Sequence, residues 1–217
     1  MKNFIFLGAP GAGKGTMAEK LSAEQSVQHI STGAILREEI ANGTKLGTEV
    51  KNIMASGGLV PDSVVANIIA GTLASEDVRN AGFILDGFPR TTNQAEILSE
   101  LLKENGIELD AIILFDVNED ILIQRLTGRR VCKGCGSTLH HMLFNPPVVA
   151  NTCSKCGGEL YQREDDNVDT AKDRLATYTE LTLPLVDFYK QTGKLIVINA
   201  EPSQSDVFNA LKKNINA

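Results

Sequence analysis

The feature that most restricts the fold of this chain is a glycine-rich segment near its start, Gly8-Ala9-Pro10-Gly11-Ala12-Gly13-Lys14-Gly15-Thr16. The apolar residues 2–7 before it predict a buried strand, and residues 16–22 after it predict a helix. A strand, a glycine-rich loop and a helix in this order are the context of the phosphate-binding pattern G-x-x-x-x-G-K-[ST]. Here Gly15 stands where the pattern has Ser or Thr, and Thr16 follows. The segment predicts an α/β fold that binds phosphate groups, with a ligand-free glycine turn as the alternative.

The chemistry of this segment follows from its backbone. Glycines allow successive N–H groups to point at phosphate oxygens, and the helix N-terminus adds a partial positive charge. Lys14 adds a full charge near the β- and γ-phosphates of a nucleotide. Asp86 follows a later apolar segment, and a carboxylate in that place predicts a hydrated Mg²⁺ on the phosphates.

Apolar segments alternate with helical segments along the chain. Strands are predicted at residues 2–7, 27–30, 82–85, 111–115 and 195–198. Further helices are predicted at residues 35–41, 45–55, 62–74, 92–105, 118–128, 168–191 with a break at Pro184, and 206–214. Short apolar strands separated by helices predict a five-stranded parallel sheet that is covered by helices on both faces.

Residues 130–163 interrupt this alternation and contain all four cysteines. Cys132 and Cys135 form one C-x-x-C pair, and Cys153 and Cys156 form another. This spacing is typical of a structural zinc site with four thiolate ligands, which leaves no open position for catalysis. Disulfides or free thiols are the alternative, but nothing in the sequence indicates secretion. We predict an inserted module that needs Zn²⁺ to fold.

Charge and hydropathy argue against several classes of function. The net charge is −6, whereas general nucleic-acid binding needs a basic surface. The apolar runs are far shorter than the ~18 residues of a membrane span, and the first residues lead into a strand without a signal peptide. These features favour a cytoplasmic protein that binds neither nucleic acid nor a membrane.

The arginines are distributed differently from the lysines. Lysines are scattered, as solvating side chains are, whereas four arginines flank the cysteine-containing insertion. They are Arg125, Arg129, Arg130 and Arg163. Because arginine forms bidentate contacts with phosphate, this grouping predicts a polyanion held beneath the insertion. Ordinary surface ion pairs with nearby aspartates are the alternative.

Together these segments resemble the adenylate kinase family, in its bacterial form with a long lid and a zinc site, over essentially the whole chain. The matching segments are residues 8–16, Ser31-Thr32-Gly33-Ala34-Ile35-Leu36-Arg37, residues 85–90 (L-D-G-F-P-R) with Gln94, Gly128-Arg129-Arg130, Phe144-Asn145-Pro146-Pro147, residues 163–167 and Arg174. The resemblance implies reversible phosphoryl transfer from ATP-Mg²⁺ to AMP, giving two ADP. It also implies a monomer with the P-loop nucleoside monophosphate kinase fold. Its parts would be a core (1–30, 61–127 and 166–217), an AMP-binding domain (31–60) and a zinc-binding lid (128–165).

The resemblance also implies roles for individual residues. The catalytic residues would be Lys14, Arg90, Arg125, Arg129, Arg163 and Arg174, and Asp86 would hold Mg²⁺ through water. ATP would be bound by Gly11, Ala12, Gly13, Lys14, Gly15, Thr16, Arg129 and Leu139. AMP would be bound by Thr32, Arg37, Gly58, Leu59, Val60, Gly87, Arg90, Gln94, Arg163 and Arg174, with Gln94 reading the adenine.

Three departures from the family pattern bear on these roles. Ala34 replaces the usual Asp, and Ala200 stands near a usual glycine beside the adenine. Residues 137–141 (S-T-L-H-H) contain one extra residue, so either Leu139 or His140 faces the adenine of ATP. Kinases of other nucleoside monophosphates, a GTP-dependent variant and a nucleic-acid-binding zinc ribbon are the alternatives. A GTPase switch would need an N-K-x-D segment, which the sequence does not contain.

Overall fold

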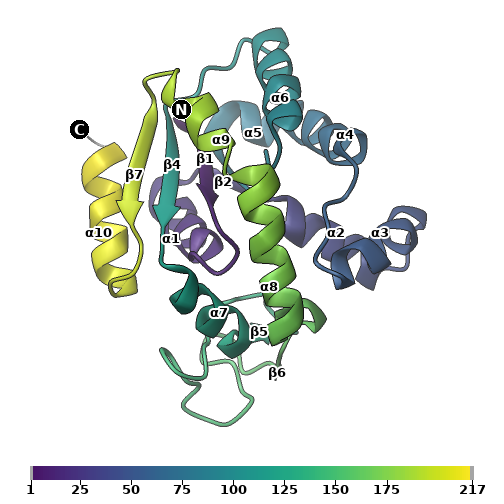
Figure 1. Ribbon diagram of the computed structural model, residues 1–217, viewed down its shortest axis with the longest axis vertical. Helices are drawn as coiled ribbons and strands as arrows, with labels where there is room; N and C mark the ends of the chain where they lie inside the picture. Colours follow the sequence, from purple (N-terminus) through teal and green to yellow (C-terminus); the bar gives the residue numbers. More distant parts are fainter. Residues whose placement is uncertain (1, 216–217) are drawn as a thin grey trace.

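A parallel sheet of five strands, in the order β2-β3-β1-β4-β7, forms the centre of the molecule in the computed structural model, which describes residues 2–215 (Figure 1). The strands are β1 (Lys2–Gly8), β2 (Gln28–Ser31), β3 (Gly82–Asp86), β4 (Ala111–Asp116) and β7 (Leu195–Asn199). All neighbouring strands pair in parallel. The predicted sheet is confirmed, and each strand boundary lies within one residue of its prediction.

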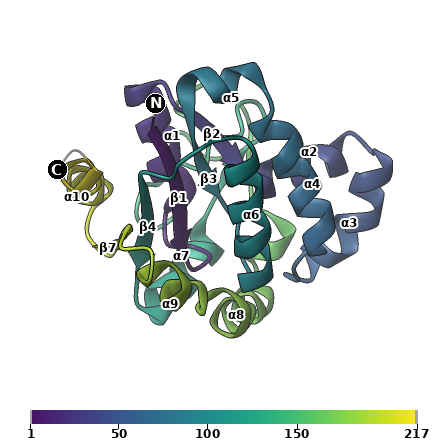
Figure 2. The same cartoon turned by 90° about the horizontal axis from the view of Figure 1, so that it is seen from above.

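The two faces of the sheet bury two separate apolar cores. Side chains alternate between the faces of a strand, so Phe4 and Phe6 of β1 enter one core while Ile5 and Leu7 enter the other. Helices α1 (Lys14–Gln25) and α10 (Gln204–Ile215) cover the first core. Helices α4 (Asp62–Leu73), α6 (Thr92–Glu104) and α9 (Leu185–Lys190) cover the second, as Figure 2 shows from above. The prediction of helices on both faces is therefore confirmed.

The other helices lie near the two ends of the strands. Helices α2 (Thr32–Ala41) and α3 (Lys45–Ala55) project to one side in Figure 1. Helix α7 (Glu119–Gly128) begins where predicted, with the side chain of Asn118 accepting a hydrogen bond from the backbone N–H of Asp120. The short helix α5 (Glu76–Ala81), capped by Ser75, was not predicted because six residues are too few to show helical periodicity.

The predicted break at Pro184 is confirmed. Helix α8 (Val168–Thr177) passes into a π-helical turn (Tyr178–Thr182), after which α9 begins beyond the proline. The backbone N–H of Leu183 donates to the carbonyl of Tyr178 at 2.8 Å, which is the wider hydrogen bond of a π turn. Proline has no N–H, and its ring conflicts with the carbonyl four residues earlier, so a regular helix cannot continue through it.

Residues 130–163, which we call the cysteine module, lie below α7 and α8 in Figure 1. The module contains a two-stranded antiparallel sheet of β5 (Val131–Cys132) and β6 (Leu160–Tyr161), which the sequence analysis did not predict. Its buried cluster consists of Cys132, Cys153 and Leu160. So small an apolar cluster needs a further source of stability.

Both ends of the described chain lie at the opposite edge of the molecule from the cysteine module (Figure 1). The ammonium group of Lys2, the first residue of β1, donates to the carbonyl of Ile215 at 3.1 Å. Every helix within residues 2–215 is too short or too polar to cross a lipid bilayer.

Candidate active site

A cleft of about 1360 Å³ opens at the carboxyl ends of the strands. Its walls come from the glycine-rich loop, from α2 and α7, and from the cysteine module. A smaller cavity of about 60 Å³ adjoins it between α2 and α4, and Arg37, Arg90 and Arg174 line both. Open parallel α/β sheets bind their ligands at this edge, because the loops that follow the strands converge there.

The glycine-rich loop forms one wall of the cleft and leads into α1. Gly13 precedes the helix with a φ of 92°, a conformation that glycine adopts without strain. The ammonium group of Lys14 donates to the carbonyls of Gly8 (2.7 Å) and Ala9 (2.9 Å), so its charge lies inside the loop. Burial lowers the pKa of Lys14 to about 8, although the charge of Asp86 opposes that shift. All the residues predicted to bind ATP line the cleft: Gly11, Ala12, Gly13, Lys14, Gly15, Thr16, Arg129 and Leu139.

Asp86 ends β3 beside this loop. Burial alone would raise the pKa of its carboxyl group, but a hydrogen bond from His29 and the charge of Lys14 outweigh burial and lower the pKa. The carboxylate is therefore ionised and suited to a hydrated metal ion. A Cβ atom at Gly15 would lie 3.3 Å from Asp86 Oδ2, which gives a steric reason for glycine where the general pattern has Ser or Thr.

Nearly all the residues predicted to bind AMP line the smaller cavity. Its lining includes Thr32, Arg37, Gly58, Leu59, Val60, Gly87, Arg90, Gln94 and Arg174. The carbonyl of Gly87 accepts hydrogen bonds from Thr32 Oγ1 and from Arg90 Nε, both at 2.8 Å. This carbonyl fixes two of the predicted side chains at the mouth of the cavity. Arg163 lines the cleft instead.

Asp166 organises the arginines at the junction of the two cavities. Its carboxylate is fully buried, accepts two hydrogen bonds from the guanidinium of Arg129, and accepts one from Arg174 at 3.0 Å. Arg174 also pairs with Asp165 at 2.9 Å. Two arginines from different segments are thus held side by side, although their charges repel.

Arg163 is the least compensated cation of the group. Its Nε atom is buried and has no hydrogen-bond partner within residues 2–215. Burial, followed by the charges of Arg129 and Arg37, lowers the pKa of Arg163 to about 9. Burial and the charge of Arg174 also lower the pKa of Arg90. This concentration of guanidinium groups is suited to a ligand with several negative charges.

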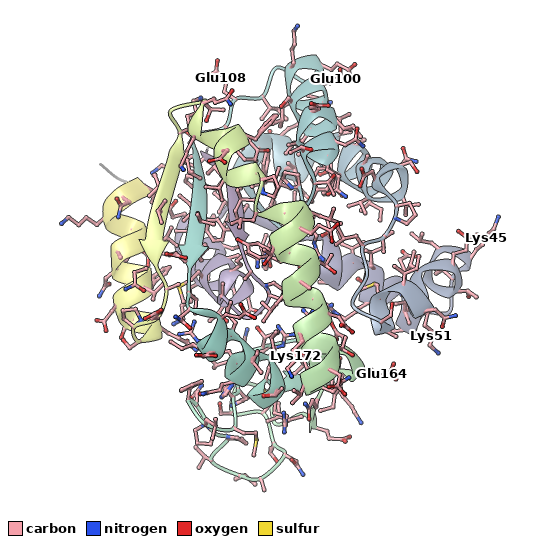
Figure 3. The ribbon with its side chains drawn as sticks, viewed as in Figure 1. Lys45, Lys51, Glu100, Glu108, Glu164 and Lys172 are labelled. Carbon is pink, nitrogen blue, oxygen red and sulfur yellow. The ribbon has the colours of Figure 1, made fainter. Side chains whose placement is uncertain are left out.

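Charges outside the cleft are arranged differently. Lys45 and Lys51 project outward from α3 (Figure 3). Arg130 was expected to help hold a polyanion, but it lines neither cavity. Its guanidinium instead donates to the backbone carbonyls of Thr127 and Arg129. Of the four flanking arginines, the cleft contains Arg125, Arg129 and Arg163.

The cysteine module contributes one wall of the cleft. Leu139 is half-buried on that wall, whereas His140 is only 1% exposed and its Nε2 accepts a hydrogen bond from the backbone N–H of Ser154. Both residues line the cleft, and Leu139 is the more exposed of the two. Arg125 lines the cleft and donates to the carbonyls of Ala200 (2.8 Å) and Glu201 (3.0 Å), so it holds α7 against the loop after β7.

The four cysteines converge within the module. Their Sγ atoms all lie within 4.8 Å of one another, with 3.4 Å between Cys132 and Cys156 and 3.8 Å between Cys135 and Cys153. Four sulfurs about 2.3 Å from a tetrahedral Zn²⁺ would be about 3.8 Å apart, so the geometry fits the ion. Backbone N–H groups of Gly134 and Cys135 donate to the sulfur of Cys132, which favours the thiolate.

A phosphate-binding loop, a parallel sheet and a cationic cleft with two compartments define a P-loop phosphotransferase. The sequence pattern of the adenylate kinase family matches residues 6–194. An adenylate kinase of Listeria innocua is 48% identical over 209 residues, 96% of each chain. One of Caldicellulosiruptor bescii is 47% identical over 209 residues, again 96% of each. One of Bacillus cytotoxicus is 47% identical over 206 residues, 95% of this chain and 94% of the relative.

The chain belongs to the adenylate kinase family. This confirms the expected family and the α/β fold. It also confirms the expected function as an adenylate kinase, which is a phosphotransferase that acts on a nucleoside monophosphate.

Two residues that contact the predicted site residues were not identified from the sequence. His29, interpreted there as structural, has its Nε2 3.4 Å from Asp86 Oδ2. The parallel register pairs Ser31 with Asp86, and His29 lies two residues before Ser31 and so on the same face. Only that register, which the sequence does not give, could have revealed this contact. Asp62, which contacts Gln94, carries no motif signal at all.

Proposed function

We propose that the cleft holds ATP and AMP end to end and that the chain reversibly transfers the terminal phosphoryl group of ATP to AMP, giving two ADP. The supporting observation is that the glycine loop and the smaller cavity meet at one arginine cluster, with Arg90 and Arg174 lining both cavities. Two phosphate chains that enter from opposite sides would converge on the same positive charges.

The mechanism we propose needs alignment and charge neutralisation rather than a covalent intermediate, because phosphoryl transfer has a loose transition state. Lys14 and the glycine loop would hold the phosphates of ATP, and Arg90 those of AMP. Arg163 and Arg174 would act between the two, with Arg125 and Arg129 acting from the side of the cysteine module. Asp166 would keep Arg129 and Arg174 in place through the hydrogen bonds described above. Closure of residues 128–165 as a lid would exclude water and prevent hydrolysis of ATP.

Two metal ions fit this mechanism. The ionised carboxylate of Asp86 would hold Mg²⁺ through water, and the ion supplies positive charge to the phosphates of ATP. Zn²⁺ on the four cysteines would keep the lid folded while it moves as a rigid body. The division into a core (1–30, 61–127 and 166–217), an AMP-binding domain (31–60) and this lid is part of the proposal. A cytoplasmic monomer that binds neither nucleic acid nor a membrane stays a prediction from the sequence.

A coupled assay for ADP formation tests the proposed function, with ATP and AMP omitted in turn. We expect ADP only when both nucleotides are present, and tight binding of a mimic that joins two adenosines through five phosphates. A panel of monophosphates and GTP as donor tests the alternatives. Preference for UMP, CMP or GMP, or failure of the mimic to bind, would contradict the proposal.

The pKa of Lys14 predicts how ATP binding depends on pH. With a pKa of about 8 in the free protein, Lys14 loses its proton above that pH, whereas the phosphates of ATP favour the charged form. We therefore expect the Kd for ATP to rise by up to about tenfold per pH unit above pH ~8. Calorimetry at pH 9 in buffers of different ionisation enthalpy should show proton uptake on binding. Lys14→Arg should abolish this uptake, and no uptake by the unaltered protein would show that Lys14 is not its source.

A further inference from the structure

The amide of Gln94 is held at both of its ends. Gln94 is only 2% exposed. Its Oε1 accepts a hydrogen bond from the backbone N–H of Arg90 at 2.7 Å, and its Nε2 donates to Oδ1 of Asp62 at 2.7 Å. A backbone N–H only donates and a carboxylate oxygen accepts, so the two partners together allow one orientation of the amide. One N–H and one oxygen lone pair of Gln94 stay free for a ligand.

Asp62 is well placed to impose this orientation. It is the first residue of α4, where a negative charge is favourable, and it reaches across to the start of α6. Its Oδ2 accepts hydrogen bonds from Asn93 Nδ2 (2.6 Å) and Thr91 Oγ1 (3.3 Å), which leaves Oδ1 to Gln94. Asp62 lines neither the cleft nor the smaller cavity, so it would act only through Gln94.

We propose that Asp62 is a positioning residue that sets the base specificity of the monophosphate site. This proposal rests on the proposed function, in which Gln94 reads the adenine of AMP. Adenine presents an amino donor at C6 beside the acceptor N1, whereas guanine presents the acceptor O6 beside the donor N1–H. An amide in one fixed orientation pairs with the donor and acceptor of one base. With the other base, the same amide leaves buried polar groups without hydrogen bonds. An amide that is free to turn over would accept both.

Asp62→Asn tests the proposal, because asparagine has nearly the same shape but can offer either an acceptor or a donor to Gln94. We expect the KM for AMP to rise about tenfold, with kcat at saturating AMP and the KM for ATP unchanged within about twofold. The preference for AMP over GMP, measured as a ratio of kcat/KM, should fall about tenfold. If Asp62→Asn does not fold, Asp62→Ser, whose hydroxyl cannot reach Gln94, should give the same pattern.

Asn93→Ala is the matched control. It removes a donor to Asp62 without touching Gln94, and we expect it to leave the KM for AMP and the preference over GMP unchanged. In a Gln94→Ala background, Asp62→Asn should have no further effect on the KM for AMP, since a positioning residue acts only through its partner. An unchanged AMP/GMP ratio in Asp62→Asn, or a full additional loss in the double variant, would overturn the proposal. Failure of the unaltered protein to phosphorylate AMP would instead overturn the proposed function.

Discussion

Lys14→Ala is expected to lower kcat by about a thousandfold or more without loss of the fold. The ammonium group of Lys14 lies inside the glycine loop, held by two backbone carbonyls, and no other side chain supplies a full positive charge from that loop. Removing it leaves the charge on the transferred phosphoryl group less well neutralised. Because burial of a charged lysine costs free energy, the Tm of Lys14→Ala should be equal to or higher than that of the unaltered protein.

The measurement is the steady-state rate of ADP formation, with circular dichroism and thermal unfolding as evidence of folding. Lys172→Ala is the matched control: Lys172 is exposed on α8 and lines neither cavity (Figure 3). Its kcat should be unchanged. Arg90→Ala should also lower kcat by orders of magnitude, since Arg90 borders both cavities. Turnover within about threefold of normal in Lys14→Ala would refute the assigned role.

Removal of Zn²⁺ is expected to lower the Tm by about 10 °C or more. The cysteine module buries only a small cluster, Cys132, Cys153 and Leu160, so the metal would supply most of the free energy that keeps it folded. The chelated protein and Cys153→Ser should both unfold at a lower temperature than the unaltered protein. Their kcat at low temperature should be affected less than their Tm, because the reacting groups of the core stay in place.

Metal analysis and scanning calorimetry, before and after chelation, measure this effect. Lys155→Ala is the control, because Lys155 lies between Cys153 and Cys156 but has no thiolate. This variant should bind zinc and unfold at the same temperature as the unaltered protein. Protein produced with zinc supplied but containing none, or a Tm that chelation does not move, would exclude the zinc site.

Local sequence patterns predicted the parts of the molecule that depend on local chemistry. The apolar run of residues 4–7 predicted a buried strand, and the structure buries that strand on both faces. The glycine-rich segment predicted the loop that lines the cleft. The cysteine spacing predicted the cluster of sulfurs.

What the sequence could not predict depends on contacts between distant segments. The strands β5 and β6 are two residues each and exist only because the ends of the module meet. His29 reaches Asp86 through the register of β2 against β3. Asp62 reaches Gln94 because α4 packs beside the start of α6. None of these pairings leaves a periodic signal in the sequence.

The hydrogen bond from Lys2 to the carbonyl of Ile215 has a practical consequence for engineering. It brings both ends of the described chain together at the edge remote from the cleft. Adjacent termini at the surface are the condition under which circular permutation succeeds. A short peptide could bridge them while new ends are opened in an exposed connection, for example at Asn105–Gly106 after α6. A fluorescent reporter fused there would stand clear of the nucleotides.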